Sequence, residues 1–128
     1  MRIFKNKAFT RFARKAGIDD ASICKAVRDA ERGLLDADLG GGVIKQRVAR
    51  SGGGKSGGFR TLILFRIGAL AFFVHGFAKN EQANIDDDEL LALRKLAAIM
   101  LAYGDAALCR ALENKTLIEV ICDEKTIP

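Results

Sequence analysis

The sequence has no apolar run long enough to cross a membrane. A transmembrane helix needs roughly 20 consecutive apolar residues, whereas the longest near-candidate, residues 68–78, is shorter and is followed by Lys79. The basic N-terminus also lacks the apolar segment of a secretory signal. We therefore expect a cytoplasmic protein that has no membrane partner.

Cysteine and histidine are scarce, which limits disulfide and metal chemistry. Cys24, Cys109 and Cys122 form no CxxC pair, and the single histidine, His75, is not clustered with them. An odd, scattered set of this kind argues against a disulfide framework or a zinc site. We expect the cysteines to be small apolar fillers in a reducing compartment, and a single imidazole excludes any mechanism that needs two histidines.

The charged residues are unevenly distributed along the chain. Through Asn80 there are 16 Lys and Arg against 6 Asp and Glu, a net charge of +10, whereas from Glu81 onward there are 5 against 10, a net charge of −5. A basic first part suits a polyanionic partner, although a merely solvated basic surface remains an alternative. The 128 residues are 49% hydrophobic, so we expect one domain, residues 1–128, with a buried core.

Two short helices are predicted near the N-terminus. The first spans residues 6–15, because Asn6 can cap its start and Gly17 stands at the position where helices commonly end. The second starts at an Asp19 cap and ends at Gly33, with apolar residues at helical spacing between them. Together they form a helical hairpin.

After Gly33 the apolar period changes from helical to alternating. Residues 43–50 alternate so that Ile44, Gln46 and Val48 share one face. Phe59–Arg66 and Leu70–Ala78 are rich in Phe, Leu, Ile and Val, which is typical of strands. The glycine-rich residues 51–58 are predicted to form a turn. We expect three antiparallel strands between residues 43 and 78.

The last third of the chain is predicted to be mainly helical. Asp86 and Glu89 form a capping box at the start of a helix. A helical turn over residues 105–112 and a short strand over residues 117–121 follow. The predicted class is α+β, with the N-terminal helical hairpin and this further helix packed on an antiparallel β-sheet.

Basic side chains concentrate on the predicted sheet and the turn within it. Residues 43–59 contain four basic residues and no acidic residue. Lys45 and Arg47 are two apart on one strand, so they point the same way. On the third strand, His75, Phe77 and Lys79 share a face. Pairing the strands would gather four cations near one surface: Lys45, Arg47, Arg60 and Lys79. Arg50 and Lys55 lie in or beside the turn.

This arrangement suits RNA binding and, with the right geometry, RNA cleavage. Phosphates attract many cations, and glycines let a loop approach a backbone closely. Attack by a ribose 2′-hydroxyl needs a base, stabilisation of phosphate charge and an acid. A lysine crowded by cations can act as the base, and arginine can bind phosphate bidentately, so no metal or other cofactor is required. RNA-binding proteins without catalysis would show the same pattern. The segment SGGGKSGG lacks the spacing of a nucleotide-binding loop.

The stretch DADLGGGVIKQRVARSGGGKSGGFRTLILFR, followed by FFVHGFAKNEQANI and an acidic-capped helix, resembles the HigB-like branch of the RelE/ParE toxin superfamily. The similarity runs from Phe9 to about Ile121. It implies a small RelE-like fold and a toxin whose relatives cleave mRNA, often on the translating ribosome. It also implies neutralisation by a cognate antitoxin with a DNA-binding, helix-turn-helix type domain.

The resemblance also implies roles for individual residues. The positions where relatives carry basic, RNA-contacting and catalytic side chains match Lys45, Arg47, Lys55, Arg60 and Lys79. We assign catalysis to Lys45, Arg47, Arg60 and Lys79, and RNA binding to Arg50, Lys55, His75 and Phe77. Relatives often have a tyrosine where this chain has Phe77, so another group must donate a proton if cleavage occurs.

Three functions remain open from the sequence. The first is a ribosome-dependent endoribonuclease, the second a gyrase-directed toxin of similar fold, and the third a non-catalytic RNA-binding or inactive relative. Cations on the central strands, rather than in a C-terminal tail, favour the first. A cognate protein is expected to cover the basic surface in the resting cell.

Overall fold

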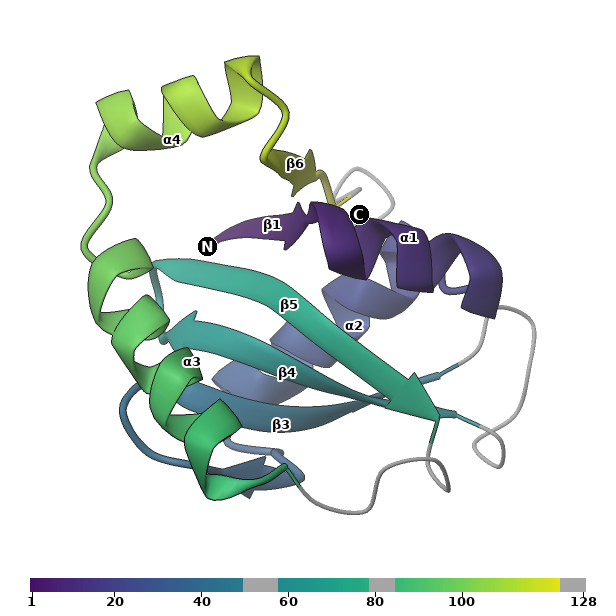
Figure 1. The fold of residues 1–128 in the computed structure, drawn as a ribbon. Helices are drawn as coiled ribbons and strands as arrows, with labels where there is room; N and C mark the ends of the chain where they lie inside the picture. Colours follow the sequence, from purple (N-terminus) through teal and green to yellow (C-terminus); the bar gives the residue numbers. More distant parts are fainter. Residues whose placement is uncertain (50–57, 79–84, 123–128) are drawn as a thin grey trace.

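The computed structural model describes residues 1–49, 58–78 and 85–122. Within these ranges six strands and four helices follow one another along the chain (Figure 1). In order, they are β1 (Arg2–Asn6), α1 (Lys7–Ala16), α2 (Asp20–Glu31), β2 (Ala37–Asp38), β3 (Val43–Val48), β4 (Phe59–Arg66), β5 (Leu70–Ala78), α3 (Asp87–Met100), α4 (Asp105–Glu113) and β6 (Leu117–Val120).

The strands form one sheet in the order β2-β3-β4-β5-β1-β6. All neighbours are antiparallel except β1 and β5, which run parallel. In Figure 1, α2 lies behind this sheet and α3 lies in front of it. The predicted α+β class, with helices on an antiparallel sheet, is confirmed.

The sheet separates two apolar cores. On one face, Phe9 of α1 and Ile23 of α2 are fully buried with Ile63 of β4. On the other face, Ala97 of α3 is buried with Leu64 of β4. Since alternate strand residues point to opposite faces, each central strand contributes to both cores.

The predicted N-terminal helical hairpin is confirmed, together with its caps. Asn6 accepts a hydrogen bond from the backbone N–H of Phe9 at 2.7 Å, and Asp19 accepts one from Ser22 at 2.9 Å. Gly17 ends α1 with a φ of 75°, a left-handed conformation that glycine adopts without steric cost. Local residue chemistry therefore determines where α1 and α2 begin and where α1 ends.

The three central strands and the third helix also match the prediction. β3 and β4 pair antiparallel, as do β4 and β5. The capping box of α3 is present in full, because Asp86 accepts from Glu89 N at 2.8 Å and Glu89 accepts from Asp86 N. α4 and β6 follow where a helical turn and a short strand were expected.

Two strands were missed, so the predicted element order was incomplete. β1 precedes the helical hairpin and lies between β5 and β6, with Phe4 opposite Phe72. Its five residues are not joined to a neighbouring strand by a short turn, and the strands that it pairs with are far away in sequence. No local pattern therefore predicts it. β2 has only two residues and pairs with Lys45 and Ile44, which is too short for a period to be detected.

The expectation that the cysteines form no disulfide was wrong. Cys24 and Cys122 are bonded, with an S–S distance of 2.05 Å and Cα atoms 5.8 Å apart. Cys24 lies on the buried side of α2, and Cys122 follows β6, packed against the same core. Residues 98 apart in sequence therefore meet because both elements cover one face of the sheet. Cys109 is free and exposed.

No helix in the described ranges is both long enough and apolar enough to cross a bilayer.

Candidate functional site

Strand register brings the predicted sheet residues together on one face. Residues directly opposite in an antiparallel pair project from the same side of the sheet. Two such rows cross β3, β4 and β5: Arg47, Arg60 and Phe77 in one, and Lys45, Leu62 and His75 in the other. The predicted clustering of Lys45, Arg47 and Arg60 with His75 and Phe77 on one face is therefore what the pairing produces.

This face is the one on which α3 packs, and α3 covers its opposite end. Val43, two residues before Lys45, is buried in the core beneath α3. Ile44 and Val48 point the other way, into the core beneath α1 and α2. Lys45 and Arg60 therefore lie off the face on which Ile44 and Val48 are buried. Their side chains keep 25% and 14% of their surface exposed, so both are accessible but constrained.

Lys45 and Arg60 meet at one carboxylate oxygen. Oδ2 of Asp36 lies 3.1 Å from Nε of Arg60, in a hydrogen bond, and 3.7 Å from Nζ of Lys45. Asp36 directly precedes β2, and its backbone N–H donates to the carbonyl of Lys45 at 3.1 Å. The short β2–β3 pairing therefore places an anion between two cations from different strands.

Sequence reasoning missed Asp36. It lies outside the acid-free residues 43–59, and the pattern contained no sign that residue 36 would return beside residue 45. The available signal was the run of glycines at residues 40–42, all with positive φ, which turns the chain back on itself. A carboxylate between two cations reduces their mutual repulsion and fixes both side chains.

His75 and Phe77 are neighbours on this face but differ in access. Their rings are 5.8 Å apart between centroids, at an interplanar angle of 39°. His75 is exposed, whereas Phe77 is 8% exposed and has no hydroxyl. The imidazole of His75 can give or accept a proton, which the ring of Phe77 cannot.

Three predicted site residues lie outside the described residues: Arg50, Lys55 and Lys79. Their roles remain predictions. In the part of the chain that the structure describes, no group of three or more His, Cys, Asp and Glu side chains is placed to hold a metal ion.

A hollow of about 500 Å³ adjoins the candidate site between α2 and the edge of β3. Asp36 and Arg47 line it on one side, together with Leu34 and Leu35, and Ala26 of α2 lines the other. Its size falls in the range of small-molecule pockets. Lys45 and Arg60 do not line it, so it meets the candidate site only at Asp36 and Arg47.

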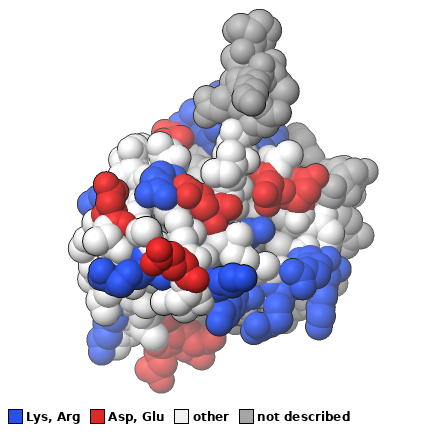
Figure 2. Space-filling view, turned by 90° about the horizontal axis from the view of Figure 1, so that it is seen from above, with Lys and Arg blue, Asp and Glu red and all other residues white. Residues whose placement is uncertain are grey.

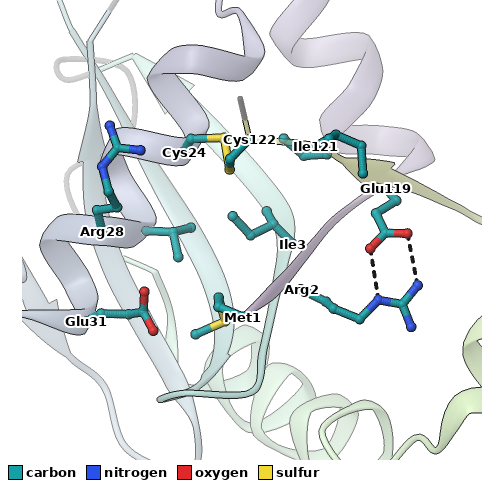
Figure 3. A pocket seen from close by; sticks show the side chains of 11 residues that line it. Met1, Arg2, Ile3, Cys24, Arg28, Glu31, Glu119, Ile121 and Cys122 are labelled. Atoms are coloured by element: carbon teal, nitrogen blue, oxygen red, sulfur yellow. Dashed lines mark hydrogen bonds and ion pairs between the residues drawn. A yellow bond between two sulfur atoms is a disulfide. The ribbon is translucent and has the colours of Figure 1, made fainter. Parts of the chain in front are cut away.

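A second hollow, of about 330 Å³, lies away from these residues (Figure 3). Figure 3 shows Arg2 and Glu119 facing each other across its edge, with the Cys24–Cys122 bond nearby. Nε and Nη2 of Arg2 each donate to Glu119 at 2.9 Å, and this hydrogen bonding raises the pKa of Arg2 above its ordinary value. The pair satisfies itself, and no predicted site residue lines the hollow, so we place the candidate site on the sheet.

Comparison with known proteins identifies the family to which the chain belongs. Residues 1–120 match the family model described as the RelE toxin of the RelE/RelB toxin–antitoxin system. No curated protein sequence matches the chain closely enough to count as a relative. The matched region covers every described strand and helix, and the system pairs each toxin with an antitoxin. The chain belongs to the RelE toxin family.

Proposed function

We propose that the chain is a toxin of the HigB-like branch and an endoribonuclease that cleaves mRNA on the ribosome, in the cytoplasm, until a cognate antitoxin with a helix-turn-helix type domain neutralises it. The observation that carries this proposal is the convergence of Lys45 and Arg60 on Asp36, on a sheet face that also presents Arg47 and His75.

The proposed reaction uses the ribose of the RNA itself. The 2′-hydroxyl loses its proton to a base, its oxygen bonds to phosphorus, and the 5′-oxygen leaves with a proton taken from an acid. Charge builds up on the phosphate oxygens during this exchange, and preplaced cations lower its energy. Arg60 can bind these oxygens with its planar guanidinium, and Lys45 can approach them as a point charge.

Proton transfer is assigned to groups on the same face. A lysine was expected to act as the base, and we assign this role to Lys45, because Lys79 lies outside the described residues. His75 is the exposed imidazole in the same row as Lys45, so we assign it the transfer to the leaving oxygen that a tyrosine hydroxyl would otherwise make. With His75 in this role, the proposed cleavage does not need a tyrosine at position 77.

Base binding is the remaining requirement for positioning a scissile phosphate. The hollow beside Asp36 and Arg47 is partly apolar, through Leu34 and Leu35. An unstacked base placed there would lie beside Arg47, at the edge of the sheet next to the Asp36 ion pairs. Unpaired bases are what sequence-specific RNA-binding proteins usually hold, which suits single-stranded mRNA as the substrate.

Mapping of RNA ends tests the proposed activity. The chain is expressed from a tightly controlled promoter, and primer extension is run on a reporter mRNA with and without a start codon. We expect new 5′ ends inside the translated region, absent from the untranslated control and suppressed when the neighbouring gene is co-expressed. Growth arrest without new RNA ends would contradict the nuclease, and double-strand breaks in DNA would indicate the gyrase-directed alternative.

Replacing Asp36 by asparagine tests whether this carboxylate positions the two cations. Asp36→Asn removes a negative charge beside Lys45 and Arg60, so we expect tighter RNA binding and a KM severalfold lower. Because the cations lose their common partner, we expect kcat to fall about tenfold or more, as small displacements of catalytic groups commonly cause. Single-turnover and steady-state cleavage measure the two effects separately.

Asp20→Asn is the matched control for this experiment. Asp20 also forms an ion pair, 3.4 Å from Lys5, but on the α2 side of the molecule. It should leave both KM and kcat close to the parent values. An Asp36→Asn protein with unchanged kcat would show that the carboxylate does not position the site.

A further inference from the structure

One side of α1 is a row of exposed cations. Lys7, Arg11, Arg14 and Lys15 are all exposed, while Phe9 and Ala13 on the opposite side are buried. Residues spaced by three or four lie on the same side of a helix, so these four form one stripe, roughly 12 Å long at 1.5 Å per residue. We call it the α1 stripe.

Figure 2 shows the stripe's surroundings from above. Lys and Arg side chains gather along the edge of the molecule where α1 lies, and the acidic side chains in this view lie mainly elsewhere. α1 itself contains no Asp or Glu. The ion pairs found between described residues involve other cations, none of them from the α1 stripe.

Repulsion between the cations of the α1 stripe weakens α1, whereas α2 pairs opposite charges. Like charges three or four residues apart repel each other by a few tenths of a kcal/mol per pair. α2 places opposite charges at the same spacing, with Lys25 and Asp29 3.0 Å apart. Arg14 and Lys15 lie in the last turn, where the helix dipole favours cations, but Lys7 in the first turn and Arg11 have no such benefit. A helix that contacts a polyanion gains from all four.

Aromatic residues on α1 are turned away from the stripe. Phe9 packs on Phe73, with centroids 5.2 Å apart, and Phe12 meets the edge of Phe59 at 5.5 Å. The ring of Phe12 also lies directly over Gly76, where an added Cβ would be 2.3 Å from Cε2. These contacts hold α1 in one orientation on the sheet, so the stripe is a rigid surface of cations alone.

The kind of polyanion follows from this lack of exposed rings. Sites for single-stranded nucleic acid combine cations with aromatic side chains on which bases stack. The sheet site has that combination, because His75 lies on the same face as Lys45 and Arg60. In a double helix the bases are already stacked on one another, and its outer surface is a line of phosphates that cations alone can bind.

We propose that the α1 stripe is a second RNA-binding surface that holds the phosphate backbone of a base-paired RNA. The choice of RNA over DNA rests on the proposed function; the phosphate contact itself does not. Phe12 packs from α1 onto one face of the sheet, and Lys45 and Arg60 project from the other. A folded RNA on α1 would therefore anchor the protein while a single strand enters the sheet site.

Duplex binding by a stripe variant tests this proposal. Lys7, Arg11, Arg14 and Lys15 are all replaced by glutamine, which has similar helix propensity. The ligand is a fluorescent 2′-O-methyl RNA duplex, which lacks the hydroxyl needed for cleavage. We expect binding at least about tenfold weaker, and a slope of log K against log salt lower by roughly three to four, about 0.9 for each phosphate contact. Circular dichroism checks that α1 still forms.

The control variant carries the same change in net charge elsewhere. Four exposed arginines outside α1 are replaced by glutamine: Arg28, Arg32, Arg66 and Arg110. We expect little change in affinity or salt slope. If both variants lose the same affinity for the duplex, the effect is one of net charge and the proposal is overturned. An unchanged affinity of the stripe variant would also overturn it.

Further ligands separate the duplex from other partners. A single-stranded 2′-O-methyl RNA should bind the stripe variant nearly as well as the parent, because the sheet site is intact. If polyglutamate competes with the duplex at equal charge concentration, the stripe fits an acidic protein instead, and the proposal fails. If the four substitutions weaken binding of a DNA duplex of the same sequence more than they weaken binding of the RNA duplex, the assignment to RNA is overturned. None of these measurements depends on cleavage, so failure of the proposed nuclease activity would be seen separately.

Discussion

Replacing Arg60 or Lys45 by alanine is expected to lower RNA cleavage by about a hundredfold or more, with the fold intact. Removal of one group that stabilises developing charge typically has an effect of this size. Both side chains lie on the sheet face away from Ile44 and Val48 and keep part of their surface exposed. Truncation therefore leaves the core beneath α1 and α2 unchanged. The measurement is translation-coupled cleavage of a defined mRNA by each purified variant.

Arg66→Ala provides the control for Arg60→Ala. Arg66 is an exposed arginine on the same strand, at the end next to the β4–β5 turn. We expect it to cleave like the parent. If circular dichroism shows that Lys45→Ala and Arg60→Ala are folded and both cleave as fast as the parent, these two side chains do not form the site. If His75→Ala is inactive while Lys45→Ala and Arg60→Ala cleave like the parent, the roles assigned to Lys45 and Arg60 are wrong and the imidazole carries the chemistry.

Breaking the Cys24–Cys122 bond is expected to give the largest change in stability. In the chain-entropy description, a cross-link that closes a loop of about 100 residues stabilises the folded state by up to about 4.7 kcal/mol, and measured values are commonly 2 to 4 kcal/mol. The bond here joins residues 98 apart. The double variant Cys24→Ser, Cys122→Ser should therefore unfold at a clearly lower urea concentration than the oxidised parent.

Cys109→Ser and a reductant complete this experiment. Cys109 is free and exposed, so its replacement should leave the unfolding midpoint unchanged. Adding a thiol reductant should bring the parent to the stability of the double variant and leave the double variant unaffected. Identical midpoints for oxidised and reduced parent protein would mean that the bond contributes no stability. Because neither cysteine is among the residues of the sheet site, we expect the folded double variant to retain cleavage below its unfolding range.

Much of the secondary structure and one face of the site could be predicted from the sequence alone. The caps Asn6, Asp19 and Asp86 act on backbone groups three residues away, so their effect depends on local order only. Alternation along β3 separated Lys45 and Arg47 from the core residues Ile44 and Val48, because strand geometry assigns faces without any partner. The family resemblance is likewise carried by contiguous segments.

Tertiary structure decided the features that join distant segments. β1 forms a strand because it pairs with β5 on one side and β6 on the other. Its five residues are too few for an alternating pattern that would predict a strand. Asp36 reaches Lys45 and Arg60 only once β2 has paired with β3. Cys24 and Cys122 meet because α2 and the chain after β6 cover one core. Each of these contacts depends on how the elements are placed relative to one another. Burial of both sheet faces determines that placement, and no local sequence pattern contains it.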